Sequence, residues 1–451
     1  MSSSFFFQSM KVAINRSILQ IASIVITAIL GLYSTQVLSE FSLALSFAAM
    51  LFVLVSYIQL GVQPEFSQYY AAKNYTGLLK LLRVTMICIF IVSAILIAII
   101  WTIPSPFSNS DPSIGRNSWG ALKIIVVSLP LVGLLTSISY FLESIGVIGG
   151  VTKLMICQFF LQIFLVISAV YLQNKFFYSD LPPVFLVASS YVLSDFFMLI
   201  VGIFFLRYSL KSKSIFISKD TENTTTFYLE LLKVIKFGLP VMLGALGQKL
   251  IFYFCVNFCA ILGVWQTSVF TIMISMTLFL QIPLIGVASL LTLKISNFRG
   301  KKDNLMIINI SSKYQGIFIA ELVIISLSLF LFYRTIIGFF TYDMEIINRM
   351  LEMKFYVIMY FIMNASLIFN MSALRGFSDN FTPQLIVLSL LFLGIVPYVK
   401  FFSPQVSLTQ LIIVFTISGV TASSILYIRL KKNFPASPSF LIKARNEEEL
   451  Q

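Results

Sequence analysis

A glutamine and a lysine lie side by side in a strongly apolar stretch of this sequence. The stretch is LGALGQKLIFYFCVNFCAIL, residues 243–262, and the two residues are Gln248 and Lys249. If the stretch is a membrane helix, the Lys249 ammonium raises the free energy of insertion by about 2.5–3.5 kcal/mol. Lys249 therefore needs an ion-pair partner, a path for its ammonium to the interface, or a function such as binding an anionic part of a substrate. A position that faces lipid is the remaining alternative.

Three carboxylates and one amide also occur in apolar stretches. Asp195 lies at a depth similar to that of Lys249 and is the carboxylate expected to pair with it. Glu321 and Glu143 are expected to have structural or gating roles. Asn257 is a further candidate for a substrate or ion site, with a helix–helix hydrogen bond as the alternative.

The residue types exclude several enzyme chemistries. The chain has no histidine, which removes Ser-His and Cys-His nucleophilic pairs and histidine general bases. Its four cysteines lie in apolar stretches without the further ligands of a metal site, although Cys255 and Cys259 share a helical face. The sequence also contains no glycine-rich phosphate loop that ends in GK[ST]. We therefore expect no enzyme, no metal centre and no cofactor other than a coupling ion, Na⁺ or H⁺.

The composition predicts an all-α integral membrane protein. Hydrophobic residues make up 58% of the chain and charged residues 11%, and the mean hydropathy is +0.95. Soluble domains have about 45–50% apolar and about 25% charged residues. Apolar runs of about 20 residues, the length that crosses a bilayer, predict twelve helices: 17–38, 41–62, 84–103, 121–143, 152–173, 184–206, 237–261, 266–290, 314–333, 354–374, 384–402 and 408–430.

The distribution of Lys and Arg between these helices predicts the topology. With the N-terminus inside, 23 of the 31 basic residues fall in cytoplasmic segments and seven in outer segments, which leaves Lys249 within the membrane. This bias predicts that both termini are cytoplasmic. It also accounts for the net charge of +13 without a nucleic-acid partner, because the basic segments face an anionic membrane surface. We expect a monomer in the cytoplasmic (inner) membrane of a bacterium, with the bilayer and a small-molecule or lipid-linked substrate as partners.

Internal similarity predicts two six-helix bundles. Gly61 and Gly286, each followed by Val, precede polar segments at an offset of 225, and Leu142 and Leu374 match at an offset of 232. The expected domains are an N-terminal bundle over residues 1–206, a cytoplasmic linker over 207–236, a C-terminal bundle over 237–430 and a tail over 431–451. An even number of helices in each copy gives both copies the same orientation, so the repeat axis runs along the membrane normal.

The second half of the chain resembles a transporter family. The segment LFYRTIIGFFTYDMEIINRMLEMKFYVIMYFIMNASLIFNMSALRGFSDNFTPQLI, residues 331–386, is similar to multidrug and toxic compound extrusion (MATE) transporters, in which FT-D-x-E-[IV] leads into LRG-x-x-D-x-x-TP. FGLPVMLG, residues 237–244, resembles the start of helix 7 in that family. The resemblance implies two bundles around a central cleft, alternating access, and efflux of organic cations coupled to Na⁺ or H⁺ entry.

Three positions depart from the pattern of this family. Counting back from Gly263 places Gln248 where members carry a helix-7 glutamate, and counting back from Leu374 places Asn364 where they carry a helix-10 aspartate. Ser34, in GLYST, stands where some members have a helix-1 aspartate. An amide can bind Na⁺ through its oxygen, but it cannot take up a proton near neutral pH.

These residues predict a MATE-type secondary-active exporter with an altered coupling site. Its substrate would be an amphipathic small molecule that is neutral, zwitterionic or anionic. A flippase for a lipid-linked saccharide of the multidrug/oligosaccharidyl-lipid/polysaccharide superfamily is the first alternative, and a membrane-embedded glycan transferase or polymerase is the second. Arg375 and Asp379, in the segment RGFSD, are expected to hold a loop by a local ion pair, and Arg375 is the repeat counterpart of Glu143.

Overall fold

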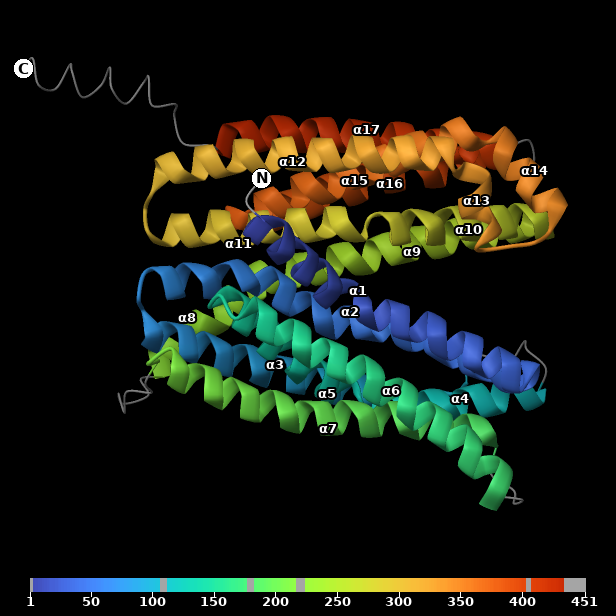
Figure 1. Ribbon diagram of the computed structural model, residues 1–451, viewed down its shortest axis with the longest axis horizontal. Coiled ribbons are helices and arrows are strands. Elements are labelled where there is room, and N and C mark those ends of the chain that lie inside the picture. Colours follow the sequence, from blue (N-terminus) through green and yellow to red (C-terminus); the bar gives the residue numbers. More distant parts are fainter. Residues whose placement is uncertain (1–2, 106–111, 177–181, 216–223, 403–406, 434–451) are drawn as a thin grey trace, which may run out of the picture. The chain divides into compact units, whose positions relative to one another are not determined.

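The structure is a computed structural model in which all described elements are helices (Figure 1). It describes residues 3–105, 112–176, 182–215, 224–402 and 407–433. The elements are α1 (Ser3–Tyr33), α2 (Thr35–Ala71), α3 (Tyr75–Thr102), α4 (Pro112–Val126), α5 (Leu129–Ser144), α6 (Ile148–Phe176), α7 (Pro183–Ser212), α8 (Thr224–Lys233), a π-helical turn η1 (Val234–Gly238), α9 (Leu239–Leu262), α10 (Val264–Leu280), α11 (Ile282–Gly300), α12 (Asn304–Leu331), α13 (Tyr333–Gly338), α14 (Met344–Glu352), α15 (Lys354–Gly376), α16 (Phe381–Phe402) and α17 (Leu408–Asn433).

The helices confirm the all-α membrane fold. Nine helices in the described ranges are long and apolar enough to cross a bilayer, and three bent pairs raise the number of spans to twelve. Two of the predicted spans are bent pairs of helices: α4 meets α5 at 43°, and α10 meets α11 at 51°. The second helix of each pair has a proline in its first two positions, Pro130 in α5 and Pro283 in α11. Proline is tolerated there because the first backbone N–H groups of a helix have no acceptor within the helix.

The chain packs as two compact units, each described here by itself. Unit 2 consists of Ile14–Leu246, and unit 1 consists of Met1–Ala13 with Gly247–Gln451. The division therefore falls inside α1 and inside α9, whereas the expected domains meet at the linker 207–236. Of that linker, residues 216–223 lie outside the described part, and the rest extends α7 or forms α8 and η1.

Two glycines allow the first part of each divided helix to pack closely. A Cβ atom at Gly61 of α2 would overlap the carbonyl oxygen of Phe237 in η1, within unit 2. A Cβ atom at Gly286 of α11 would overlap the carbonyl oxygen of Ser9 in α1, within unit 1. Only a residue without a side chain permits such a backbone approach. The turn η1, which leads directly into α9, is thus held by α2, and the start of α1 is held by α11.

Matching turns show the internal repeat. Lys73 and Lys302, which are 229 residues apart, both have positive φ, 56° and 59°, and the next residues, Asn74 and Asp303, cap α3 and α12 with their side chains. The expected offset of 225 is therefore one helical turn too short in this part of the chain. Gly146 and Ser378 repeat a second positive-φ turn at the expected offset of 232.

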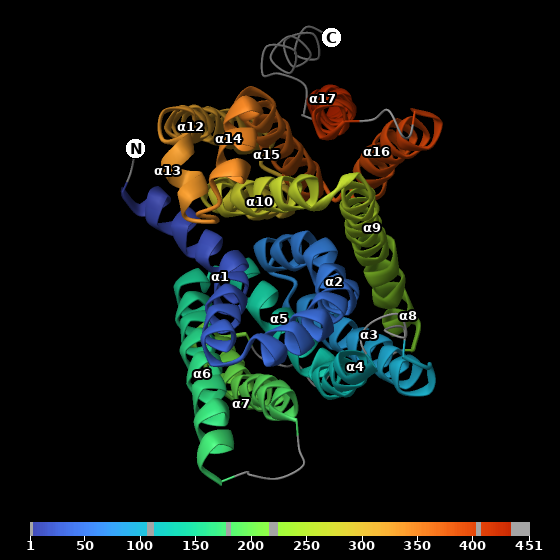
Figure 2. The same cartoon turned by 90° about the vertical axis from the view of Figure 1, so that its right-hand side faces the viewer.

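Unit 2 has two apolar clusters. One surrounds Phe41, Trp119 and Tyr191, and the other surrounds Phe66 and Phe141. The neighbouring helices α6 and α7 run along each other, as Figure 2 shows from a second direction. In unit 1, α15 packs along both α11 and α17.

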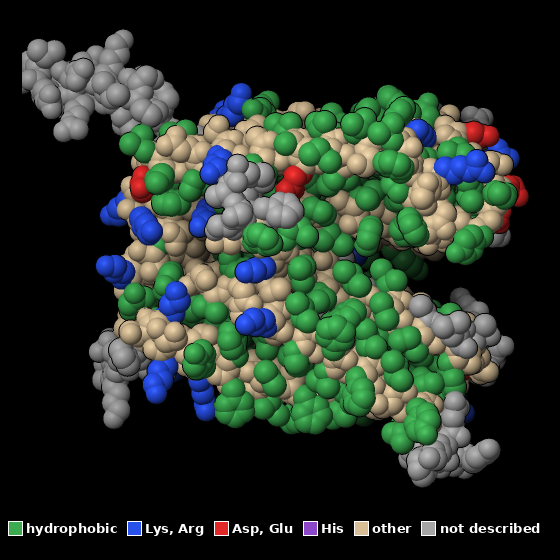
Figure 3. Space-filling model, viewed as in Figure 1, with side chains coloured by type: hydrophobic (Ala, Val, Ile, Leu, Met, Phe, Trp, Pro, Cys, Tyr) green, Lys and Arg blue, Asp and Glu red, His purple; other side chains and the backbone are tan. Residues whose placement is uncertain are grey.

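Large apolar side chains also cover the outside of the helices, as expected for contact with lipid (Figure 3). On the face drawn, most Lys and Arg side chains lie toward one end of the helices.

Candidate functional site

Asp195 lies at the centre of a buried polar cluster in unit 2. Its residue is 3% exposed on α7, and Gln158 Nε2 on α6 donates a hydrogen bond of 3.0 Å to its Oδ1 atom. Within unit 2, no described Lys or Arg lies within ion-pair distance of this carboxylate. Buried carboxylates are normally paired, bound to a cation or protonated. Asp195 can therefore take up a proton or a monovalent cation.

Several oxygen atoms close to Asp195 along the chain or in space have no hydrogen-bond partner. Ser194 is the immediate neighbour of Asp195 on α7, and its hydroxyl is buried without a partner among the described residues. The Tyr191 hydroxyl, one turn before Asp195, lies beside Ser23 of α1. Ser128 lies beside Asp195 at the break between α4 and α5. The Oε1 atom of Gln158 is also unused. Such oxygens could complete the shell of a bound cation, and the bend at Ser128 is what brings a third helix segment to the cluster.

In unit 1, a hydrogen-bonded pair of neutral amide side chains lies at the bend between α10 and α11. Asn364 Nδ2 on α15 donates a hydrogen bond of 3.2 Å to Oε1 of Gln281, which is completely buried at the bend between α10 and α11. Neither group can carry a charge near neutral pH. Gln281 was not among the predicted residues, although a lone polar residue just before Pro283 marks it in the sequence.

Lys249 is exposed on α9, and in unit 1 no described carboxylate lies within ion-pair distance of it. Tyr253 and Asn257 are exposed one and two turns further along the same side. Gln248 is half-buried, and it lies on the opposite side of α9 from Asn257 because nine residues make about two and a half turns. Asp195 belongs to unit 2, so its pairing with Lys249 stays a prediction.

Ser34 does not lie inside helix 1 as expected, because α1 ends at Tyr33 and Ser34 is the N-cap of α2. Its hydroxyl accepts a hydrogen bond of 3.4 Å from the backbone N–H of Val37. Serine favours this position because its oxygen satisfies a backbone donor that the helix leaves free.

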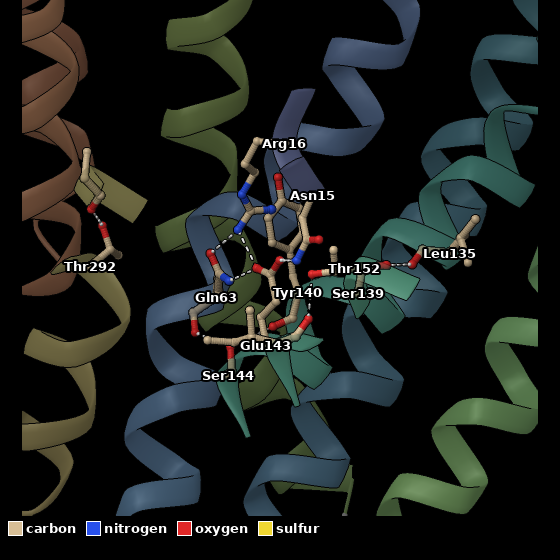
Figure 4. A network of polar contacts seen from close by, with 12 residues as sticks. Asn15, Arg16, Gln63, Leu135, Ser139, Tyr140, Glu143, Ser144, Thr152 and Thr292 are labelled. Atoms are coloured by element: carbon tan, nitrogen blue, oxygen red, sulfur yellow. Dashed lines mark hydrogen bonds and ion pairs between the residues drawn. The ribbon is translucent and has the colours of Figure 1, made fainter. Parts of the chain in front are cut away.

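The Glu143 carboxylate accepts hydrogen bonds from side chains of two other helices, α1 and α2 (Figure 4). Arg16 Nη2 on α1 lies 2.7 Å from its Oε2 atom, Gln63 Nε2 on α2 donates at 3.0 Å, and Asn15 Nδ2 donates to Oε1 at 2.8 Å. The Arg16 guanidinium also stacks 3.8 Å from the centre of the Tyr140 ring. The Glu143 side chain is 1% exposed and has its charge fully compensated, which favours the predicted structural role. Arg16 and Gln63 were not predicted as its partners.

Asp379 has a partner that was not predicted, and its expected ion pair with Arg375 stays a prediction. Asp379 Oδ2 lies 2.5 Å from Nε of Arg429 on α17, and Asn433 donates to the same oxygen. The pair joins the turn between α15 and α16 to α17, 50 residues further along the chain, which sequence proximity does not indicate. Glu321 is half-buried on α12, and its Oε2 atom is buried without a hydrogen-bond partner in the described ranges.

Comparisons with known proteins agree with this architecture. Residues 12–167 match the family model MatE. No curated protein sequence matches the chain significantly. The chain is similar in structure to the eukaryotic MATE transporter AtDTX14, with a TM-score of 0.81 and 16% identity over 95% of this chain and 96% of that one.

Two further solved structures are similar to nearly the whole chain. A MATE protein in the bent conformation has a TM-score of 0.82 and 14% identity over 94% of both chains. A transporter of the MOP superfamily from Pyrococcus furiosus Vc1 has a TM-score of 0.79 and 14% identity over 95% of this chain and 94% of that one, and it is described as having a binding pocket of reverse polarity.

Proposed function

We propose that this chain is a secondary-active exporter of the MATE family, which its match to the family model over residues 12–167 and its similarity in fold to MATE structures support. It would move an amphipathic small molecule out of the cytoplasm by alternating access, from the cytoplasmic membrane of a bacterium with both termini inside. The observation that carries the proposal is Asp195, a buried carboxylate in a membrane helix with an amide donor and no counter-ion among the described residues of unit 2.

Asp195 is the group we assign to ion coupling. Exporting a substrate against its gradient requires a site that changes its charge or its bound ion between the two sides of the membrane. Asp195 can do so, because one protonation or one bound Na⁺ neutralises a charge that is costly to bury. Gln248 and Asn364 cannot take up a proton, so coupling in unit 1 at these positions would be limited to Na⁺ bound by amide oxygens.

Lys249 supports a substrate with an anionic group. Its ammonium is exposed in the middle of a membrane helix, without a described carboxylate partner in unit 1. An exposed cation attracts carboxylates, sulfonates or phosphates and repels organic cations. The binding pocket of reverse polarity described for the Pyrococcus furiosus transporter of similar fold supports the proposal that pocket charge differs among such proteins. We therefore propose zwitterionic or anionic cargo.

Transport by purified protein in liposomes tests the proposal. The assay follows the movement of cationic, zwitterionic and anionic fluorescent compounds under an imposed Na⁺ or H⁺ gradient. We expect gradient-driven movement of zwitterionic or anionic compounds, its loss in Asp195→Asn, and its retention in Glu321→Gln, which also neutralises a carboxylate in a membrane helix. Lys249→Ala should reduce transport of the anionic compounds.

Each part of the proposal has its own contrary result. Full coupling in Asp195→Asn would reject the assigned coupling residue. Transport of cationic dyes alone, unchanged in Lys249→Ala, would reject the proposed substrate class. A failure of every compound to respond to either gradient would contradict secondary-active export.

A further inference from the structure

The Lys123 ammonium lies close to two tryptophan rings at one end of unit 2. On α4, Lys123 Nζ is 5.7 Å from the centre of the Trp119 ring, and it is 5.9 Å from the centre of the Trp101 ring at the end of α3. Trp101 is exposed. Tryptophan is enriched at the membrane–water interface, and the face of its ring attracts cations. The two rings therefore favour a position of the ammonium near the phospholipid headgroups.

A second cation lies on the same side of α4. Arg116 is seven residues before Lys123, which is about two helical turns, and it is exposed. Among the described residues of unit 2, no carboxylate lies within ion-pair distance of either cation. Both belong to the seven basic residues of the predicted outer segments, against 23 in the cytoplasmic segments. The charge bias that directs the topology therefore does not account for these two cations.

An exposed row of isoleucines on α3 leads towards these cations. Ile87, Ile91, Ile95 and Ile99 occur at every fourth position and are 40–53% exposed. The row is about 18 Å long at about 1.5 Å per residue, close to the half-thickness of about 15 Å of the hydrocarbon core of a bilayer. Trp101 follows two residues after Ile99. An apolar row as long as one leaflet thus ends near two cations that have no described carboxylate partner in unit 2.

We infer that Lys123, Arg116 and Trp101 form a binding site for an anionic phospholipid, the Lys123 site. The lipid phosphate accepts hydrogen bonds from the ammonium and the guanidinium, and an acyl chain lies along the isoleucine row. A headgroup with net negative charge is preferred, because the two cations repel the ammonium of a zwitterionic headgroup. The inference does not depend on the proposed export, since the site contains none of the residues assigned to coupling or to cargo.

Fluorescence quenching by brominated lipids tests the inference on the full-length protein in vesicles. The chain has three tryptophans, so Trp265→Phe leaves only Trp101 and Trp119 as indole fluorophores. Bromine on an acyl chain quenches an indole that it contacts, and brominated phosphatidylglycerol is compared with brominated phosphatidylcholine at equal mole fraction. We expect the anionic lipid to occupy the site about five- to thirtyfold more strongly, because each cation near a membrane surface contributes a factor of about five.

Substitutions then assign this preference to the two cations. Lys123→Gln and Arg116→Gln, each made in the Trp265→Phe protein, should lower the preference about fivefold. Lys400→Gln is the matched control, because it removes an exposed cation of another predicted outer segment, on α16 in unit 1. It should leave the preference unchanged.

The comparison of the two lipids on the Trp265→Phe protein remains decisive even if a further variant does not fold. Equal quenching by both lipids would overturn the inference. So would a Lys123→Gln protein with an unchanged preference, or a Lys400→Gln protein that loses the preference to the same extent. Loss of the preference on addition of inorganic phosphate, but not of chloride at the same ionic strength, would also overturn it and assign the site to a soluble anion.

Discussion

Removal of the Arg16 guanidinium should leave the Glu143 carboxylate buried with too few donors. Arg16→Met removes the 2.7 Å ion pair and the stacking on Tyr140, while the hydrogen bonds from Asn15 and Gln63 remain. Breaking a buried ion pair by removing one partner destabilises a protein by about 3–5 kcal/mol. Because two amide donors remain on Glu143, we expect the lower end of this range, about 3 kcal/mol.

The same substitution made in the Glu143→Gln variant separates the contribution of the Glu143 charge from that of the packing of Arg16. Arg16 Nη2 also donates a hydrogen bond of 3.1 Å to Gln63 Oε1. In Glu143→Gln the acceptor is neutral, so the further change Arg16→Met should remove only the stacking on Tyr140 and this bond to Gln63, a loss of about 1 kcal/mol. The coupling energy between the two positions is then about 2 kcal/mol, within the range found for contacting residues. Arg429→Met is the matched control, because its pair with Asp379 is more exposed and should contribute less than about 1 kcal/mol.

The assay is reversible unfolding by titration with sodium dodecyl sulfate in mixed micelles, followed by loss of helical circular dichroism. Equal effects of Arg16→Met in the two backgrounds would refute the reasoning, because Glu143 would then not depend on Arg16 for its charge. An effect of Arg429→Met as large as that of Arg16→Met would show that burial does not set the magnitude.

Three further predictions concern packing, capping and the amide pair. Gly61→Ala should destabilise the protein by about 1–3 kcal/mol because the new methyl meets the η1 backbone, whereas Gly316→Ala, which has open space around it, should be neutral or slightly stabilising in the same titration. Ser34→Ala should lower the unfolding free energy by about 0.5–2 kcal/mol through loss of the α2 cap, and an unchanged midpoint would contradict that role. Gln281→Leu should cost about 1–3 kcal/mol because it leaves the Asn364 amide without its acceptor, and the double change with Asn364→Leu should recover part of the loss.

Hydropathy and local turn residues were sufficient to predict the class, the number of spans and the repeat. A membrane helix must satisfy its own backbone and present apolar side chains for about 20 residues, so each span is visible in a short window of sequence. The turn around Leu142 and Leu374 could likewise be matched from local residues, and the structure repeats its positive-φ backbone at the same offset.

The contacts of the polar residues could not be predicted in this way. Glu143 meets Arg16 across 127 residues, Asp379 meets Arg429 across 50 residues, and Asp195 meets Gln158 on another helix. The sequence also did not indicate that the first residues of α1 belong to unit 1 and the first part of α9 to unit 2. Hydropathy reports how deeply a residue can be buried in a membrane, whereas its partner depends on which faces of distant helices pack together. That choice is made by the sum of many interhelical contacts, and therefore only by the folded chain.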